Sequence, residues 1–136
     1  LVNVLAALGV AQLEQLDSFI ASKINTAAYY RDNLSGVGDI GFQLVQEGVQ
    51  SNEWLFTITT SSMQELLDHL NARGVMSRPF WIPMNQLPMY RENLYVHHSD
   101  ISARVHGSAV SIPCSTSISE ADLKQVVSCI KQFFDR

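Results

Sequence analysis

The sequence has few lysines, few cysteines and no cluster of basic residues. Three lysines and two cysteines occur in 136 residues, and the net charge of −4 comes from scattered acidic residues. Without a basic stripe to neutralise phosphates, nucleic-acid binding and a polybasic membrane anchor are both disfavoured. No apolar run approaches the ~20 residues that a membrane-spanning helix needs, and nothing near the start resembles a signal peptide. We therefore expect a cytoplasmic protein that binds neither nucleic acid nor membrane.

The two cysteines, Cys114 and Cys129, are too few for a disulfide framework. In a cytoplasmic protein, isolated cysteines behave as small hydrophobic residues. We expect both to be reduced and buried, and a disulfide between them is the less favoured alternative.

The sequence also lacks a complete catalytic motif. No glycine-rich phosphate loop joins a strand to a helix, and the four histidines show no metal-ligand spacing. We expect His69 on the polar side of its helix and His106 at a helix end, with all four histidines solvated or capping. Lys23, Lys124 and Lys131 lie between the apolar positions of predicted helices, where a solvated ammonium group is the default. The sequence therefore predicts no catalytic, cofactor-binding or metal-ligating residue in this chain.

The composition, 46% hydrophobic and 16% charged, is that of one globular domain with its own core. Apolar residues at three- and four-residue spacing predict one long amphipathic helix over residues 5–34, ended by Ser35 and Gly36. The small residues of its first turns predict close packing on a part of the protein outside this sequence, or else they simply favour helix. The chain starts without methionine and almost inside this helix, so we expect a fragment.

The pattern of the rest of the chain predicts an α+β domain. Alternating and β-branched residues predict strands over residues 40–45, 54–59, 75–77 and 109–113. Capping-box patterns and apolar stripes predict helices that start at Ser62 and Ser119 and end near Gly74 and Phe134, with a shorter helix over residues 100–106. Helices collected on one face of a small antiparallel or mixed sheet form an α+β sandwich.

One segment, RPFWIPMNQLPMY at residues 78–90, fits neither a helix nor an interior strand. Pro79, Pro83 and Pro88 remove backbone donors and exclude a continuous helix. The residue before each proline is restricted to extended conformations. We call residues 78–90 the proline segment and expect a rigid loop that is first extended and then turns.

The proline segment also carries the candidate substrate-binding residues. Arg78 offers a planar fork of donors for a phosphate or carboxylate. Trp81 and Tyr90 offer flat aromatic faces with polar tips, and Asn85 can donate to and accept from hydroxyl groups. Trp54 is a weaker candidate, because a tryptophan on a strand is more often part of the core. The alternative is that the hydrophobic residues of the segment cover the sheet while Arg78 pairs with a surface acid.

Three stretches resemble the C-terminal domain of the DegT/DnrJ/StrS aminotransferases. They are NVLAALGVAQLEQLDSFIASK at residues 3–23, ARGVMSRPFWIPMNQLPMY at 72–90 and SIPCSTSISEADLKQVVSCIKQFF at 111–134. The first is similar to the helix that opens this domain, the second to an Arg-Pro pair followed by a P-x-H-x-x-P-x-Y pattern, and the third to the closing strand and last helix. Asn85 stands where many members carry histidine, and an amide forms hydrogen bonds but cannot titrate.

The resemblance implies that residues 1–136 are the small C-terminal domain of the aspartate-aminotransferase fold, the type I fold of pyridoxal 5'-phosphate enzymes. Such enzymes are homodimers that move an amino group, usually from glutamate, onto a nucleotide-linked keto sugar. The sequence of the proline segment is most similar to that of enzymes that act on nucleotide-linked 4-keto-6-deoxy sugars. Such enzymes serve the biosynthesis of surface polysaccharides such as lipopolysaccharide. The cofactor lysine belongs to a large domain outside this chain, so we expect the chain alone to be inactive.

Two other functions are compatible with the residues. A free-standing, non-enzymatic module for ligand binding or protein interaction would need neither a catalytic lysine nor a phosphate loop. A protein that has lost catalysis and only regulates a pathway would also fit.

Overall fold

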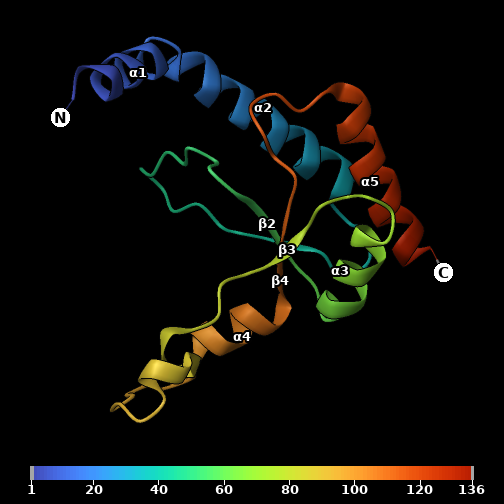
Figure 1. Ribbon diagram of the computed structural model, residues 1–136. Coiled ribbons are helices and arrows are strands. Elements are labelled where there is room, and N and C mark those ends of the chain that lie inside the picture. Colours follow the sequence, from blue (N-terminus) through green and yellow to red (C-terminus); the bar gives the residue numbers. More distant parts are fainter. Residues whose placement is uncertain (1, 136) are drawn as a thin grey trace.

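A four-stranded sheet, in the order β1-β2-β4-β3, lies at the centre of the computed structural model, which describes residues 2–135 (Figure 1). All three strand pairings among these residues are antiparallel. The strands are β1 (Gly41–Phe42), β2 (Phe56–Thr59), β3 (Arg78–Pro79) and β4 (Ala109–Ile112). The helices are α1 (Asn3–Leu13), α2 (Leu16–Leu34), α3 (Met63–Asn71), α4 (Ile101–Ser108) and α5 (Glu120–Phe134). The predicted α+β class is confirmed.

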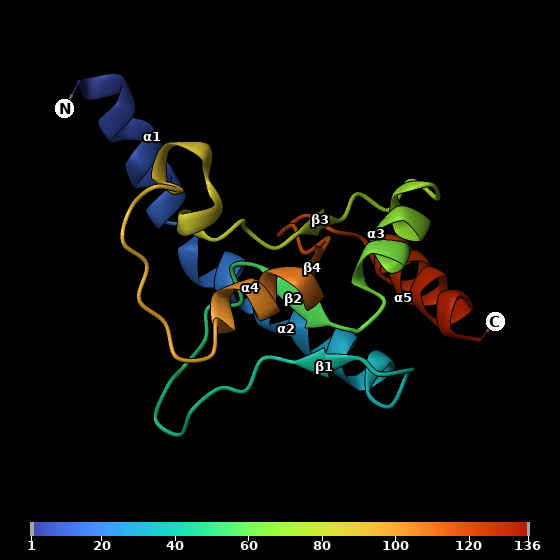
Figure 2. The same cartoon turned by 90° about the horizontal axis from the view of Figure 1, so that it is seen from below.

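One face of the sheet carries the apolar side chains and is covered by helices. Phe56 is opposite Ile112 and Ile58 is opposite Val110, so these four buried residues share one face. Helices α2, α3 and α5 pack against it, with α3 lying beside α5 in both ribbon views (Figures 1 and 2). Most alternate residues of the central strands on the other face are polar, and the hydroxyl groups of Thr57 and Ser111 there are 2.9 Å apart. The fold therefore has an apolar face covered by helices and a more polar opposite face.

The single opening helix predicted over residues 5–34 is wrong, because the structure has two helices bent by 50°. The Gln15 amide donates to the Gln12 carbonyl at 3.2 Å, and the Gln15 side chain donates to the Ala11 carbonyl at 3.2 Å. These tighter local bonds compete with the regular α-helical ladder and break it. The predicted end is confirmed, since α2 stops at Leu34 and Gly36 has φ 76°.

Helix α1 is apolar around its whole circumference and has no buried residue. Its large side chains Val4, Leu5, Leu8, Val10 and Leu13 are all more than half exposed. Within residues 2–135 no single helix is both long enough and apolar enough to cross a bilayer. Only α1 and α2 taken together have the required length and apolar composition, and they are separated by a bend.

The start of α3 differs from the predicted capping box, because the Ser62 side chain makes no capping hydrogen bond. Asp39, from the loop before β1, instead holds the turn that precedes the helix. Its carboxylate accepts from the Ser61 amide at 2.8 Å and from the Thr60 hydroxyl, whose oxygen accepts in turn from the Ser62 amide at 3.2 Å. A distant carboxylate thus fixes the turn that leads into α3.

Asp39 makes the stability of the fold depend on acid pH. Hydrogen bonds from Ser61 and Thr60 lower the pKa of the Asp39 carboxyl from 3.8 to about 2. Because the folded pKa is below the unfolded one, the stabilisation is present above pH 4 and is lost as the pH falls toward 2. In urea unfolding at a series of pH values, Asp39→Asn should flatten this decline. An unchanged decline in the variant would contradict the role of Asp39.

The last helix follows its prediction closely. Ser119 accepts from the Asp122 amide at 3.1 Å and Asp122 accepts from the Ser119 amide at 3.3 Å, which completes the capping box. Val126, Val127 and Ile130 are buried in the core as expected.

Other predicted boundaries need smaller corrections. Residues 75–77 form no strand, and the pairing with β4 starts only at Arg78. Helix α4 continues through Gly107 to Ser108. Both cysteines are buried and free, so the preferred interpretation over a disulfide is confirmed.

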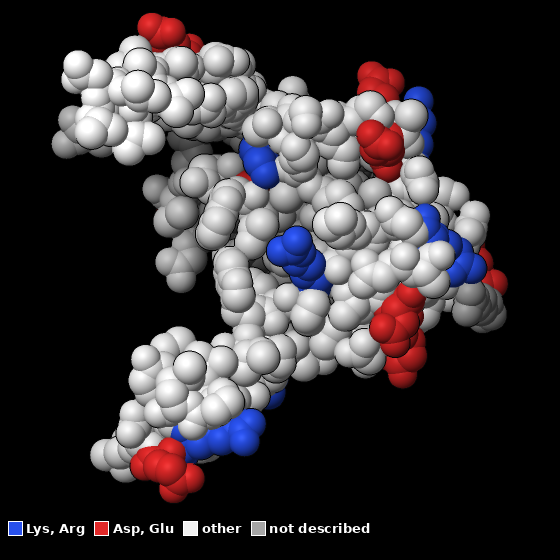
Figure 3. Space-filling view, viewed as in Figure 1, with Lys and Arg blue, Asp and Glu red and all other residues white. Residues whose placement is uncertain are grey.

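Two parts of the molecule project to the same side of the central sheet, at the left of Figure 1. Helix α1 forms one of them, and the turns after β3, together with α4, form the other (Figure 1). The space-filling view shows a deep notch between the two (Figure 3).

Candidate functional site

The proline segment leaves the sheet edge and enters the lower projection. After β3, the Phe80 amide still donates to the Ala109 carbonyl at 3.0 Å, which extends the pairing with β4. The chain then remains extended until two short 3-10 turns, Met84–Gln86 and Pro88–Tyr90. The extended-then-turning course is confirmed, and each turn begins directly after or at a proline.

His106 fixes the proline segment from α4. Its Nδ1 is 2.8 Å from the Phe80 carbonyl oxygen. A carbonyl can only accept, so Nδ1 carries the proton in this contact. His106 is at the end of α4, as expected, but its ring bonds to another segment and not to its own helix end.

A cavity of about 400 Å³ opens beside the two 3-10 turns, between the proline segment and α4. It is lined by Pro83, Met84, Asn85, Tyr90, Asn93, Leu94, Tyr95 and Ser102. The Tyr95 hydroxyl donates to Asp100 at 2.9 Å, and this hydrogen bond raises the pKa of the Tyr95 phenol. Two of the predicted site residues, Asn85 and Tyr90, thus lie together among amides and hydroxyls suited to a polyhydroxylated ligand.

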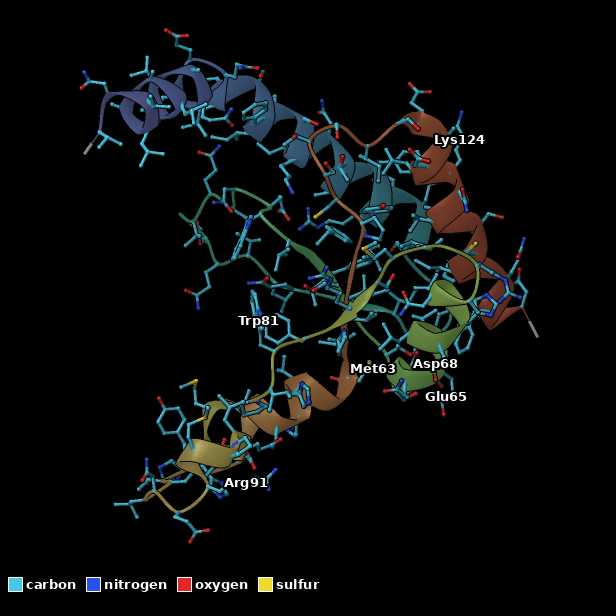
Figure 4. The ribbon with its side chains drawn as sticks, viewed as in Figure 1. Met63, Glu65, Asp68, Trp81, Arg91 and Lys124 are labelled. Carbon is cyan, nitrogen blue, oxygen red and sulfur yellow. The ribbon has the colours of Figure 1, made fainter. Side chains whose placement is uncertain are left out.

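Trp81 lies next to this cavity. A second depression, of about 380 Å³, is lined by residues 80–84 and by Ile101, Ser102 and Val105 of α4. The two hollows share Pro83, Met84 and Ser102. Figure 4 places Trp81 at the notch side of the molecule, between the two projections.

Arg78 lies apart from both hollows. Its backbone pairs with Ser111, which places its exposed side chain on the polar face of the sheet beside Thr57 and Ser111. Within the described chain Arg78 has no ion pair, which contradicts the alternative that it pairs with a surface acid. The structure thus groups Asn85 with Tyr90, places Trp81 next to them and leaves Arg78 apart, and the shared substrate role of the four stays a prediction.

Trp54 is more prominent than the sequence suggested. It precedes β2 instead of lying on the predicted strand, and 65% of its surface is exposed, so it is not part of the core. Its indole lies against that of Trp81, with ring centroids 6.0 Å apart and planes 31° apart. No local sequence pattern could pair two tryptophans from different segments.

Two further residues were misjudged as solvated. Lys23 is half-buried and donates to the carbonyl oxygens of Trp54, at 2.9 Å, and of Cys114. His69 is buried between α3 and α5, where its Nε2 is 3.0 Å from the Cys129 carbonyl oxygen and its ring meets Phe133 edge-on. Both side chains join segments that are far apart in sequence.

The lysines of the described chain do not fit a Schiff base with pyridoxal phosphate. Lys23 is held by backbone carbonyls, and Lys124 is an exposed residue of α5 that pairs with Glu120 at 3.8 Å, far from Trp81 in Figure 4. Lys131 is also on α5 and lines neither hollow.

Comparison with known proteins gives a consistent result. The DegT/DnrJ/EryC1/StrS aminotransferase family model matches residues 1–131. GDP-perosamine synthase of Vibrio cholerae is 30% identical over 98% of this chain and 37% of its own length. The crystal structure of DesV from S. venezuelae superposes with a TM-score of 0.88 at 25% identity, covering 96% of this chain and 36% of that one.

A more distant structure shares the same fold. Spr1654 of Streptococcus pneumoniae, solved in a PLP form, gives a TM-score of 0.86 at 16% identity over 99% of this chain and 36% of that one. The chain spans little more than a third of the length of the relatives that it matches. Because the family model covers nearly all of it, this chain belongs to the DegT/DnrJ/EryC1/StrS aminotransferase family.

Proposed function

We propose that this chain is the C-terminal small domain of a pyridoxal phosphate-dependent sugar aminotransferase whose large domain lies outside residues 1–136. The observation that carries the proposal is the family match over residues 1–131, combined with relatives that are nearly three times longer. In the complete protein the large domain would supply the cofactor lysine and its phosphate site, since the three lysines of this chain line neither hollow beside the proline segment.

The substrate would be a nucleotide-linked 4-keto-6-deoxy sugar, and the amino donor would be glutamate. The names of two relatives, GDP-perosamine synthase and dTDP-4-amino-4,6-dideoxy-D-glucose transaminase, support a sugar nucleotide. The product would serve the biosynthesis of surface polysaccharide, such as lipopolysaccharide, in the cytoplasm. The complete enzyme would be a homodimer.

The chain's own part is to bind and orient the substrate. Asn85 and Tyr90 line the cavity of about 400 Å³ and would hydrogen-bond sugar hydroxyls. Trp81 would offer a flat apolar surface beside them, and Arg78 would bind an anionic group from the polar face of the sheet.

An amino-transfer assay tests the proposal. The complete protein, incubated with ¹⁵N-glutamate and a panel of UDP-, GDP- and dTDP-linked keto sugars, should transfer ¹⁵N to at least one of them, as read by mass spectrometry. The 136-residue chain should transfer none and should show no visible absorption band of bound cofactor. A complete protein that transfers nothing to any member of the panel would contradict the proposal.

A further inference from the structure

Two exposed indoles form one continuous surface at the notch between the projections. Trp54 is 65% exposed and Trp81 is 60% exposed, and their rings touch with centroids 6.0 Å apart. The planes differ by 31°, so the two indoles lie tilted against each other, and each keeps an exposed aromatic surface. Because the rings are already in contact, no third ring fits between them, and a ligand would stack on their outer face.

The backbone of Trp54 is held from several sides. Its amide donates to the Asn52 side chain at 3.1 Å, and its carbonyl accepts from Lys23 Nζ at 2.9 Å. Lys23 also donates to the Cys114 carbonyl, which ties the Trp54 turn to the chain after β4. These contacts fix the backbone from which the Trp54 side chain projects.

The residue before Trp54 adopts an uncommon conformation. Glu53 has φ 50°, which is rare for a residue other than glycine and carries local strain. Its carboxylate, mostly shielded from solvent, pairs with Arg31 at 3.0 Å, and its amide donates to the Ser51 hydroxyl oxygen at 3.1 Å. The surrounding contacts therefore maintain a strained turn whose result is the outward presentation of Trp54.

Trp81 is fixed in a comparable way. The preceding residue, Phe80, donates to the Ala109 carbonyl at 3.0 Å and accepts from His106 at 2.8 Å, and its ring contacts the Trp81 ring at 5.2 Å. Both indoles thus project from anchored backbone, which lowers the entropy lost when a ligand binds.

We propose that Trp54 and Trp81 form a preorganised platform that binds the nucleobase of the nucleotide-linked substrate. This inference rests on the proposed function and adds to it the place of one part of the substrate. The cavity of Asn85 and Tyr90, which adjoins Trp81 through Pro83 and Met84, offers the polar groups that a sugar needs. The indole pair offers a face suited to an aromatic heterocycle, for which stacking contributes about 1–3 kcal/mol per base.

The two residues are the only tryptophans of the sequence, so tryptophan emission reports on the platform alone. With excitation at 295 nm, UDP and GDP should quench the emission of the 136-residue chain saturably. Ribose 5-phosphate and pyrophosphate, which lack a base, should not. Absence of saturable quenching by both nucleotides, or equal quenching by ribose 5-phosphate, would overturn the platform.

Variants separate stacking from a general effect on the fold. By calorimetry, Trp54→Leu and Trp81→Leu should each weaken nucleotide binding about 5- to 150-fold, the equivalent of 1–3 kcal/mol. Trp54→Phe, which keeps an aromatic face, should lose less. Lys23→Met should lie between Trp54→Phe and wild type, with an unchanged far-UV circular dichroism spectrum. Wild-type affinity in both leucine variants would refute the assignment.

The readout requires nucleotide binding but no amino transfer. If the platform is wrong, the ¹⁵N assay of the complete protein can still succeed. If the transaminase activity is wrong, the nucleotide titration can still succeed, so the two failures are distinguishable.

Discussion

Replacing Tyr30 with alanine is expected to lower the free energy of unfolding by about 3–5 kcal/mol. Tyr30 is fully buried where α2 meets the sheet, and its ring lies 5.1 Å from that of Phe56. Its hydroxyl donates to the Pro113 carbonyl at 2.6 Å. The truncation opens a cavity in the core and leaves that carbonyl without its partner. Urea unfolding followed by circular dichroism measures the loss.

Tyr30→Phe is the matched variant, because it removes the hydroxyl and keeps the ring. We expect a loss of about 1–2 kcal/mol, from the unpaired carbonyl alone. Burial raises the pKa of the Tyr30 phenol well above its ordinary value of 10.0. The wild type should therefore lose stability as the pH rises above 10, and Tyr30→Phe should lose less. Equal losses for the alanine and phenylalanine variants would show that the ring does not pack as described.

Replacing Arg78 with alanine is expected to lower kcat/KM of the complete protein about 10- to 150-fold, which corresponds to a charge-assisted hydrogen bond of 1.5–3 kcal/mol. Arg78 is exposed on the polar face of the sheet and has no ion pair within residues 2–135, so its guanidinium is available for an anionic ligand. The effect on folding should be small, because the side chain is not buried. Steady-state kinetics with the substrate identified by the ¹⁵N assay provide the measurement.

Two further variants separate the hydrogen-bonding geometry of Arg78 from its net charge. Arg78→Lys keeps the charge but loses the planar fork, so its loss should be smaller than that of alanine. Arg73→Ala removes an equally exposed arginine that donates to the His69 carbonyl at 3.2 Å at the end of α3, and it should leave kcat/KM unchanged. Equal losses in Arg73→Ala and Arg78→Ala would reflect net charge alone and would remove Arg78 from the site.

The parts of the fold that follow from local sequence were predictable. Ser119 and Asp122 cap α5 across three residues, and the apolar stripe of that helix reaches the core as expected. Strand β4 and the end of α2 at Gly36 follow from similarly local signals. The course of the proline segment followed from its prolines, because proline restricts its own φ and the residue before it.

The parts that failed depend on contacts across the chain. The turn before α3 is held by Asp39, 22 residues before its partner Ser61, and not by the predicted Ser62 capping box. Lys23 reaches Trp54 over 31 residues and Cys114 over 91, and His69 meets Cys129 over 60. Periodicity places such polar side chains on the solvent side of a helix, because it contains no information about which distant carbonyl will approach.

The candidate site likewise combines features that follow from local sequence with contacts that depend on the fold. Asn85 and Tyr90 are five residues apart on two short turns, so their proximity along the chain was predictable. The contact of Trp54 with Trp81 was not, since it joins the turn before β2 to the chain after β3. Residue types indicated which groups could bind a sugar nucleotide, whereas the fold alone decides which of them meet.

Hydrogen–deuterium exchange of the complete protein, with and without its sugar nucleotide, tests most directly whether the proline segment forms part of the substrate site. The account predicts slower exchange on substrate binding at residues 80–95 and in α4, with no change in α5 on the covered side of the sheet. Unchanged exchange throughout residues 80–108 in the presence of a saturating substrate would contradict it.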